Sequence, residues 1–451
     1  MKKSSFFYFS ILFIFILTIF SFNTKINKIS NVKYCYNLNY DNSILLHPDN
    51  FSKIDLSVSF ISEKEWKRLL LNSDLQAKKN ENLFGIQFYN KTKRTKAEII
   101  INIPNKIRCK LSARIRPHGL LSDHRDGSNI LPSLNVVLED GHIFGITKFI
   151  LLRPESRNWN NEIIVSTILK QAGFLSPRTT NVLLTYNNLE TNFIFQEKIA
   201  KEFLEINNYK EGPLYEGDNK FLLYFRNYPK ERYNLTRHKL INQKWSKKNL
   251  NNMIISQEGL SILNRYNENY IQNLQKIRMV PSDYFFLDNK LEKKFFSKFD
   301  VYDSLNFALK SEHGLSSDDR VYYFDPFYKK FSPIYWDGTP YLLNRNNTLN
   351  YKAKKQIIIP SAKAGSLTAL ERLSKIDNNK LLKKLNLLGV DMSKKKLSDI
   401  LEFVKNNLIE IRTTKNEFIA DLEFEKNKEI IKKKLKFDTH GFKVAFYNDT
   451  F

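Results

Sequence analysis

The stretch of this chain that most restricts its possible folds lies close to position 330. Val321–Phe324 and Phe331–Tyr335 are rich in aromatic and β-branched residues, as strands are, and Asp325-Pro326 and two lysines lie between them. Asp-Pro followed by lysines favours a turn with a solvated tip, so the sequence predicts a β-hairpin. We expect the preceding chain to form the scaffold for what this hairpin presents.

Acidic residues flank the predicted hairpin on both sides. Asp318 and Asp319 come just before the first strand, and Asp337 comes just after the second. Folding the hairpin brings these carboxylates to the same end of the sheet, where they repel one another unless a cation or a proton neutralises them. Hard oxygen ligands suit Mg²⁺ or Mn²⁺, and Gly338 permits a sharp turn and a close approach of a ligand. The pattern fits a metal site; it also fits a turn-capping Asp318 and a strand-ending Asp337.

The composition indicates a folded and strongly basic protein. Of 451 residues, 42% are hydrophobic and 14% are aromatic, which excludes a disordered chain, and the length predicts two or three domains. The 72 Lys and Arg outnumber the 47 Asp and Glu, for a net charge of +25. Such a surface attracts polyanions, but dispersed lysines without a dominant block also fit ordinary solvation. The chain has no zinc spacing, RNA-binding signature or basic-zipper repeat, so nucleic acid is not an expected partner.

The N-terminus predicts an attachment to a membrane. Phe6–Phe22 contains no charged residue and is just long enough, as a helix, to cross a thin hydrocarbon layer. No small-x-small cleavage site follows it, which favours an uncleaved signal anchor over a removed signal peptide. A single anchor before a large soluble body places that body outside the cytoplasm. In such an oxidising space Cys35 and Cys109 could pair, although two buried free thiols fit the sequence as well.

Hydrophobic periodicity predicts an α+β protein with a β-rich first part and a helical last part. The expected regions are 1–30 for the anchor and the start of a linker, 31–110 for a β-rich lead-in, 111–345 for a mixed domain and 346–451 for a helical C-terminal region. In the mixed domain, Asn161–Ala172 is predicted as a helix that Gly173 closes, and Asn187-Asn188 as a turn between two strands. Residues 207–255 are predicted as a long irregular loop of the kind that often carries a lid.

Basic residues at the end of one predicted strand form a candidate phosphate site. Arg114, Arg116, His118 and Gly119 follow one another there, and arginines beside a glycine-bearing turn suit an anion. A polar strand end that faces solvent explains the same residues. The spacings between the histidines of this region match no standard zinc site, which favours structural or solvent roles for them.

Glu197 is a further candidate. It ends the apolar strand FIFQ directly before a predicted helix, so its carboxylate is expected to be partly buried. A buried carboxylate needs a cation, and Lys148 or Arg153 is the expected partner. This pair could be structural, functional or both.

The order of these parts resembles the spore-coat protein H (CotH) kinase-like family, and more closely its divergent, envelope-associated bacterial members. The resemblance covers about residues 110–340 and rests on Arg-x-Arg-x-x-Gly, PRTTNVLLTYNN, IFQEK and YYFDPFYKKFSPIYWDG. Members have an atypical protein-kinase-like fold, bind ATP with a divalent metal and phosphorylate protein. The resemblance implies an atypical kinase-like domain that uses ATP with Mg²⁺ or Mn²⁺ on an envelope protein or surface polymer.

The resemblance also implies roles for matching residues. By it, Asp337 in Trp-Asp-Gly corresponds to the metal-binding aspartate, and Glu197 to the glutamate of a Glu–Lys pair. Arg114, Arg116 and Gly119 correspond to the phosphate loop, which Pro117 and His118 interrupt in this chain.

Further correspondences lie next to the hairpin and at a missing lysine. Asp319 lies near the family's metal-binding asparagine, and His313 or Asp318 lies near its catalytic base. Where the family has a Lys-Lys pair this chain has Pro132-Ser133-Leu134, so the nucleotide lysine is missing there and Lys148 on the following strand is a candidate substitute. Phosphoryl transfer depends on positioning and charge neutralisation, so a lost lysine makes a catalytically silent scaffold for envelope or surface-structure assembly the alternative function.

Overall fold

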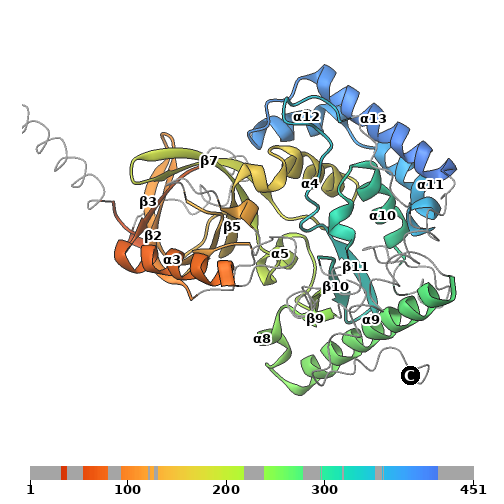
Figure 1. Cartoon of the computed structure of the whole chain (residues 1–451), viewed down its shortest axis with the longest axis horizontal. Helices are drawn as coiled ribbons and strands as arrows, with labels where there is room; N and C mark the ends of the chain where they lie inside the picture. Colours follow the sequence, from red (N-terminus) through yellow and green to blue (C-terminus); the bar gives the residue numbers. More distant parts are fainter. Residues whose placement is uncertain are drawn as a thin grey trace, which may run out of the picture.

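The structure is a computed structural model, and Figure 1 shows its barrel beside a helical region. It describes residues 32–37, 54–79, 93–119, 122–125, 131–217, 238–277, 295, 297–316, 319–350, 358 and 360–414. The predicted anchor Phe6–Phe22 and the candidate base Asp318 lie outside these residues. Within them, every helix is too short or too polar to span a lipid bilayer.

Seven strands close into a barrel in the order β1-β2-β3-β4-β5-β7-β6. Their bounds are β1 (Asp55–Phe60), β2 (Thr95–Ile103), β3 (Ile107–Pro117), β4 (Leu134–Leu138), β5 (Lys148–Leu152), β6 (Thr179–Tyr186) and β7 (Leu189–Glu197). Neighbouring strands are antiparallel, except that β1 and β6 run parallel where the barrel closes. In β3 every second residue is buried, because alternate side chains point into the barrel. The barrel therefore takes strands from both the predicted lead-in region and the predicted mixed domain, whose boundary stays a prediction.

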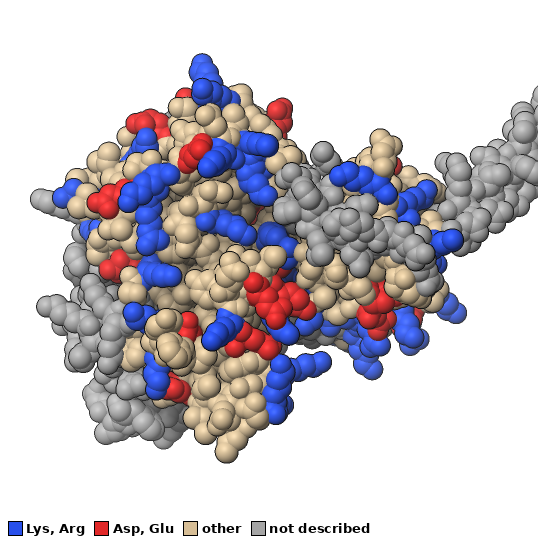
Figure 2. Space-filling model, turned by 180° about the vertical axis from the view of Figure 1, so that it is seen from behind, with Lys and Arg blue, Asp and Glu red and all other residues tan. Residues whose placement is uncertain are grey.

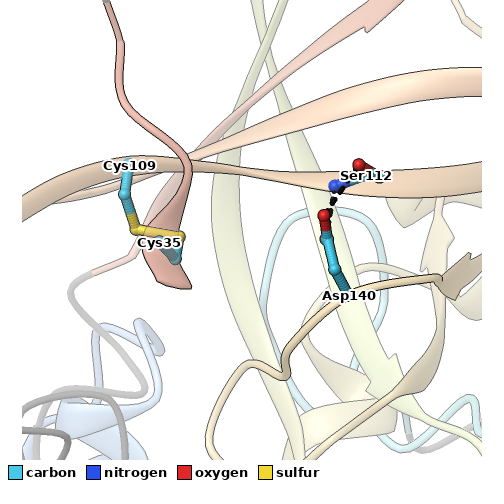
Figure 3. The surroundings of a disulfide bond; sticks show 4 residues. All are labelled: Cys35, Cys109, Ser112 and Asp140. Atoms are coloured by element: carbon cyan, nitrogen blue, oxygen red, sulfur yellow. Dashed lines mark hydrogen bonds between the residues drawn. A yellow bond between two sulfur atoms is a disulfide. The ribbon is translucent and has the colours of Figure 1, made fainter. Parts of the chain in front are cut away.

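A disulfide and a helix secure the first part of the barrel. Cys35 in the short helix η1 (Cys35–Asn37) is bonded to Cys109 in β3, with their Cα atoms 4.9 Å apart (Figure 3). Of the two alternatives for these cysteines, the structure has the pair. Helix α3 (Glu63–Lys79) covers the barrel through Trp66, whose ring stacks on Phe60 with centroids 4.1 Å apart.

The predicted hairpin is confirmed and belongs to a four-stranded sheet. Strands β10 (Val321–Asp325) and β11 (Lys330–Ile334) pair antiparallel. Strands β8 (Leu214–Gly217) and β9 (His238–Leu240) extend the sheet in the order β11-β10-β8-β9. The prediction of an irregular loop over 207–255 is wrong for these strands, because three or four residues carry too little periodicity to reveal a strand that pairing with β10 stabilises.

Helices make up the rest of the described structure. They are α4 (Asn161–Gln171), α5 (Lys201–Ile206), α8 (Gln243–Ser246), α9 (Leu250–Ile277), α10 (Phe299–Ala308), α11 (Pro360–Ser374), α12 (Asn378–Leu387) and α13 (Lys394–Thr413), with short 3-10 helices η3 (Ser122–His124), η4 (Pro154–Arg157) and η5 (Glu312–Leu315). Gly173, with φ of +85°, ends α4 as predicted. The mixed α and β architecture is confirmed, and α11, α12 and α13 lie in the described part of the predicted C-terminal region. Gly365 of α11 lies directly against the backbone of Asp300 in α10, so these helices approach at a distance that only glycine permits.

The surface charge is dispersed. Figure 2 shows Lys and Arg spread over one face of the molecule, with Asp and Glu between them. On that face the basic residues form no single block, which agrees with the solvation interpretation of the net charge.

Candidate functional site

An ion pair between a buried arginine and a partly exposed aspartate joins the barrel side of the molecule to the end of the hairpin. Arg157 ends η4, directly after β5, and is only 3% exposed. Its Nη2 lies 2.9 Å from Oδ1 of Asp337, which follows β11. Thr339 Oγ1 donates a hydrogen bond to the same oxygen at 3.2 Å. Burial raises the pKa of Asp337, but the charge of Arg157, the nearby His313 and His124 and the hydrogen bond from Thr339 together outweigh it, so the net pKa lies below its ordinary value and the carboxylate is ionised.

The backbone that presents Asp337 is strained. Asp337 and Thr339 have φ of +47° and +40°, a region that residues with a side chain rarely adopt. A Cβ on Gly338, between them, would lie 2.6 Å from the Tyr335 ring. Asn158 Nδ2 holds the segment by donating to the carbonyl oxygens of Thr339 (3.4 Å) and Pro340 (2.9 Å). Strain that neighbouring contacts enforce is typical of functional positions.

A second carboxylate faces Arg157 from α4. Glu162 is fully buried; Tyr335 OH donates to its Oε2 at 3.0 Å, and Gln196 Nε2 donates to its Oε1 at 2.8 Å. Burial raises the pKa of Glu162 to about 7, although the charge of Arg157 lowers it. Arg157 thus lies near two acidic groups, of which Asp337 is ionised and Glu162 is about half protonated at neutral pH.

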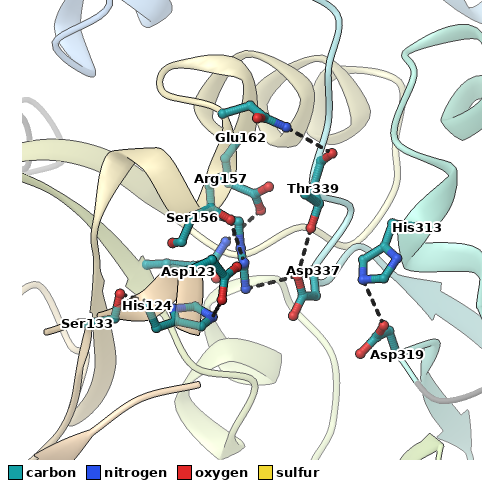
Figure 4. Close-up of polar contacts among 12 residues, drawn as sticks. Asp123, His124, Ser133, Ser156, Arg157, Glu162, His313, Asp319, Asp337 and Thr339 are labelled. Atoms are coloured by element: carbon teal, nitrogen blue, oxygen red, sulfur yellow. Dashed lines mark hydrogen bonds and ion pairs between the residues drawn. The ribbon is translucent and has the colours of Figure 1, made fainter. Parts of the chain in front are cut away.

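His313 and Asp319 lie on the other side of Asp337 (Figure 4). His313 Nε2 is 3.2 Å from Oδ2 of Asp319, and Ser316 Oγ donates to that oxygen at 3.0 Å. Gly314 brings this segment against the hairpin end, since a Cβ there would lie 2.7 Å from the carbonyl oxygen of Trp336. The structure therefore brings Asp319 and Asp337 to the same end of the hairpin, as its geometry predicts. Their metal-binding role stays a prediction.

Residues after β3 complete the barrel side of the cluster. Gly119, with φ of +86°, lies directly on the ring of His124, so a side chain there would clash. His124 Nδ1 is 3.0 Å from Ser133 Oγ, and the His118 ring meets the His124 ring edge-on with centroids 5.1 Å apart. Burial lowers the pKa of His118 well below its ordinary value, as do the nearby cations Arg157, Lys198 and Arg116. Cations from β3, η4 and the segment before α5 therefore lie near His118.

Other predicted residues do not join this cluster through any contact between described residues. Arg114 is exposed and pairs with Glu139, Nε to Oε1 at 2.5 Å. Lys148 is exposed at the start of β5. Arg116 is half-buried, and its buried Nε has no hydrogen-bond partner in the described part of the chain.

The expected partner of Glu197 was wrong. The cation is Arg178, whose Nε and Nη2 donate to Oε2 and Oε1 of Glu197 at 2.8 and 2.6 Å. The antiparallel register of β6 and β7 explains this choice, because it places Arg178 directly beside Glu197, whose N–H donates to the Arg178 carbonyl. Arg153 instead lies 3.6 Å from Glu155, Nε to Oε2.

Sequence reasoning missed Arg157 and Glu162. A signal for Glu162 existed, because it opens the helix NEIIVSTIL, which is apolar on every face and so must be buried on every face. A glutamate in such a helix has to find partners inside the protein. Arg157, in the turn between that helix and a buried strand, is the nearest arginine along the chain.

The donor set fits one kind of metal site. Among the described residues, no group of three or more His, Cys, Asp or Glu side chains is arranged to hold a metal ion. In that part of the chain Arg157 and Thr339 both contact Oδ1 of Asp337, which leaves Oδ2 for another ligand. Mg²⁺ bound mainly by substrate phosphates needs only one or two carboxylates. The residues fit a metal that phosphates share and do not fit a protein-only metal centre.

The described cavity lies elsewhere. It has a volume of about 430 Å³ and is lined by residues of β1, the β2–β3 turn, β6 and β7, among them Asp55, Lys106 and Asn192. None of its lining residues belongs to the cluster around Arg157. The cluster is the better candidate for a functional site, because it contains the buried charged residues Arg157 and Glu162.

Comparisons with known proteins found only weak structural similarity. No family model matches the chain, and no curated protein matches it. Four chains of solved structures match. One is the crystal structure of the Helicobacter pylori proinflammatory kinase CtkA, with 14% identity over 66% of this chain and 95% of that chain, at a TM-score of 0.28. A similarity this weak neither places the chain in a family nor assigns a role to any residue.

Proposed function

We propose that this chain is a divergent phosphotransferase with a kinase-like fold, which uses ATP and a divalent metal to modify an envelope protein or surface polymer. One observation carries the proposal: buried Arg157 lies between Glu162 of α4 and Asp337 at the hairpin end. Phosphoryl transfer needs a cation on the phosphates, a helix carboxylate that orients it and an aspartate for the metal. Three different elements bring these groups together here.

The proposal changes two of the expected assignments. Arg157 takes the phosphate role that the resemblance implied for Lys148, and Glu162 takes the orienting role implied for Glu197, which Arg178 occupies. Lys148 and Arg114, which are exposed outside the cluster, have no role in this proposal. Arg116 and Gly119 remain candidates for the phosphate side, because Arg116 and Arg157 both lie near His118 and Gly119 packs on the neighbouring His124 ring.

The remaining roles fall to the segment before the hairpin. His313 is half exposed and oriented by Asp319, so it can accept a proton from an acceptor hydroxyl. Asp318, the other candidate base, lies outside the described residues. A bound Mg²⁺ or Mn²⁺ would neutralise phosphate charge, and Asp337 through Oδ2 and Asp319 are the residues that would hold it.

The test compares Asp337→Asn with a matched control. Asparagine keeps the shape of the side chain and removes its charge, so stabilisation by ATP with Mg²⁺ or Mn²⁺ should disappear. Arg114→Gln removes an exposed charge outside the cluster and should leave it unchanged. The measurements are the thermal midpoint with and without ATP and metal, and transfer of radiolabel from ATP to the protein. No stabilisation of the wild type with either metal would refute nucleotide binding; equal shifts in wild type and Asp337→Asn would exclude this residue as the ligand.

A catalytically silent scaffold is the second candidate, and one observation favours it. Arg157 already pairs with Asp337, so the charge of this carboxylate is balanced without a ligand. On this alternative, Asp337→Asn lowers stability alone, and neither protein responds to ATP with metal.

Membrane topology decides whether ATP is available to the site. We propose that the predicted anchor holds the body outside the cytoplasm, and the Cys35–Cys109 disulfide supports an oxidising compartment. Active phosphotransfer there requires exported nucleotide. A reporter that is active only in the cytoplasm should be inactive when it is fused after Phe451. Washing the membranes with alkaline carbonate should leave the chain in the membrane fraction. An active reporter would overturn the placement of the body outside the cytoplasm, and quantitative release of the chain into the wash would overturn the membrane anchor.

A further inference from the structure

Large apolar side chains are exposed beside one another where the β10–β11 turn meets the start of α9. They come from the β10–β11 turn and the first turn of α9, and we call them the tip surface: Leu250, Met253, Ile254, Phe327 and Tyr328. Phe327 is 79% exposed and Tyr328 is 68% exposed. Single exposed apolar residues are common, but a group from two elements indicates a binding surface.

The hairpin tip is an ordered turn that presents its two rings outward. Asp325 Oδ1 accepts hydrogen bonds from the backbone N–H groups of Phe327 at 2.8 Å and Tyr328 at 3.0 Å. The two rings pack edge to face with centroids 5.0 Å apart. These contacts hold both aromatic side chains at a place where most of their surface is open to solvent.

The α9 residues form a stripe that continues the tip. Leu250, Met253 and Ile254 are spaced i, i+3 and i+4, so they share one face of the helix. Glu258 lies one turn further along the same face, and its Oε1 is 2.6 Å from Nζ of Lys329 in the hairpin tip. This ion pair places the two parts of the tip surface side by side.

Lysines surround the tip surface. Lys244, Lys247, Lys248, Lys329 and Lys330 are all exposed there. Figure 2 shows uncharged atoms at the lower end of the molecule, where α8 and α9 lie, with both basic and acidic residues beside them. Aromatic rings that insert at the level of lipid headgroups, bordered by lysines that reach anionic phosphates, are typical of proteins that lie on a bilayer.

We propose that the tip surface docks on an anionic lipid bilayer. Charge complementarity favours this partner, because the surrounding lysines and the net charge of +25 attract a negative membrane surface. A second copy of the chain would bring the same lysines together and would be repelled. The rings of Phe327 and Tyr328 also project from a hairpin turn, and a projecting pair of rings can insert among lipid headgroups.

The experiment uses the full chain in vesicles whose acyl chains carry bromine, which quenches nearby tryptophan. Phe327→Trp places a reporter in the tip surface. Leu189→Trp is the matched control, because Leu189 is also an exposed apolar residue but lies on the barrel. The emission of the wild-type chain is subtracted from both. Vesicles of phosphatidylcholine alone are compared with vesicles that also contain phosphatidylglycerol.

The expected result is about a twofold loss of Phe327→Trp emission in the anionic vesicles, because side chains at this depth lie about 5–10 Å into the headgroup boundary. Leu189→Trp should be unquenched, and adding Lys247→Glu and Lys330→Glu to the reporter should restore its emission. Equal quenching of the two reporters, or equal quenching of Phe327→Trp in both kinds of vesicle, would overturn the proposal. A concentration-dependent blue shift without vesicles would assign the surface to a second copy and overturn it as well.

Discussion

Replacing Glu162 with glutamine keeps the shape of the side chain and removes its titration, so it tests the electrostatics around Arg157. Burial raises the pKa of the Glu162 carboxyl from its ordinary value of 4.5 to about 7. The folded state therefore holds this proton more tightly than the unfolded state. Its contribution to stability is complete below pH 4.5 and is lost as the pH rises through about 7. A difference of about 2.5 pKa units corresponds to about 3 kcal/mol.

The assay is urea unfolding of wild type and Glu162→Gln at a series of pH values, with both proteins in one detergent because the chain carries a predicted membrane anchor. The free energy of unfolding of the variant, minus that of the wild type, should rise by about 3 kcal/mol between about pH 4 and about pH 8. His124, whose pKa burial lowers to about 4, and Asp303, whose pKa burial raises to about 6, also titrate in this range. Both are present in the two proteins, so their contributions cancel in the difference.

An infrared titration gives an independent reading of the same group. The wild type should show a protonated carboxyl band with a midpoint near pH 7, and Glu162→Gln should lack it. Stability curves that stay parallel across the pH range, or a carboxyl band with a midpoint near pH 7 that the substitution leaves unchanged in intensity, would refute a raised pKa at Glu162. Asp303, whose pKa is raised to about 6, contributes equally in both proteins and cancels in the difference spectrum. The carboxylate would then be ionised throughout, and Arg157 would be shared between two charged carboxylates.

Three further substitutions test the packing. Arg178→Met leaves the buried Glu197 without its cation and should lower the free energy of unfolding by about 3–5 kcal/mol in the same urea assay. Arg114→Gln, which breaks an exposed pair with Glu139, is the control and should lower it by under about 1 kcal/mol. Replacing Cys35 and Cys109 with serine should lower the free energy of unfolding by about 2–5 kcal/mol. If chemical reduction leaves the mass of the wild-type protein unchanged, the two cysteines are not bonded. Gly365→Ala should lower stability by about 1–3 kcal/mol through the clash between α10 and α11, and wild-type stability in that variant would count against the close contact.

Features that short-range chemistry determines could be predicted from the sequence. Asn187 and Asn188 both have positive φ, as a tight hairpin turn between β6 and β7 requires. Gly173 ends α4 because it adopts the left-handed conformation without a steric penalty. The β10–β11 hairpin followed from its aromatic runs, and it brought Asp319 and Asp337 to one end.

Partners that tertiary structure brings together could not be predicted. Asn158 and Thr339, whose hydrogen bond links the two halves of the cluster, are 181 positions apart. Nothing near Asp337 in the sequence points to Arg157, and nothing near Glu197 distinguishes Arg178 from other cations. Short strands such as β9 depend in the same way on a neighbour that lies far along the chain.

The closure of the barrel sets an order of events during synthesis. β1 pairs with β2 on one edge and with β6 on the other, where Asp55 lies opposite Leu183. The ribosome makes β6 long after β1, so a nascent chain that has completed β2 and β3 still exposes an open edge on β1. Such an edge is a template for pairing with other chains until the distant strand arrives. Crossing a membrane before folding, while chaperones hold the chain extended, would delay that exposure until both edges can be joined.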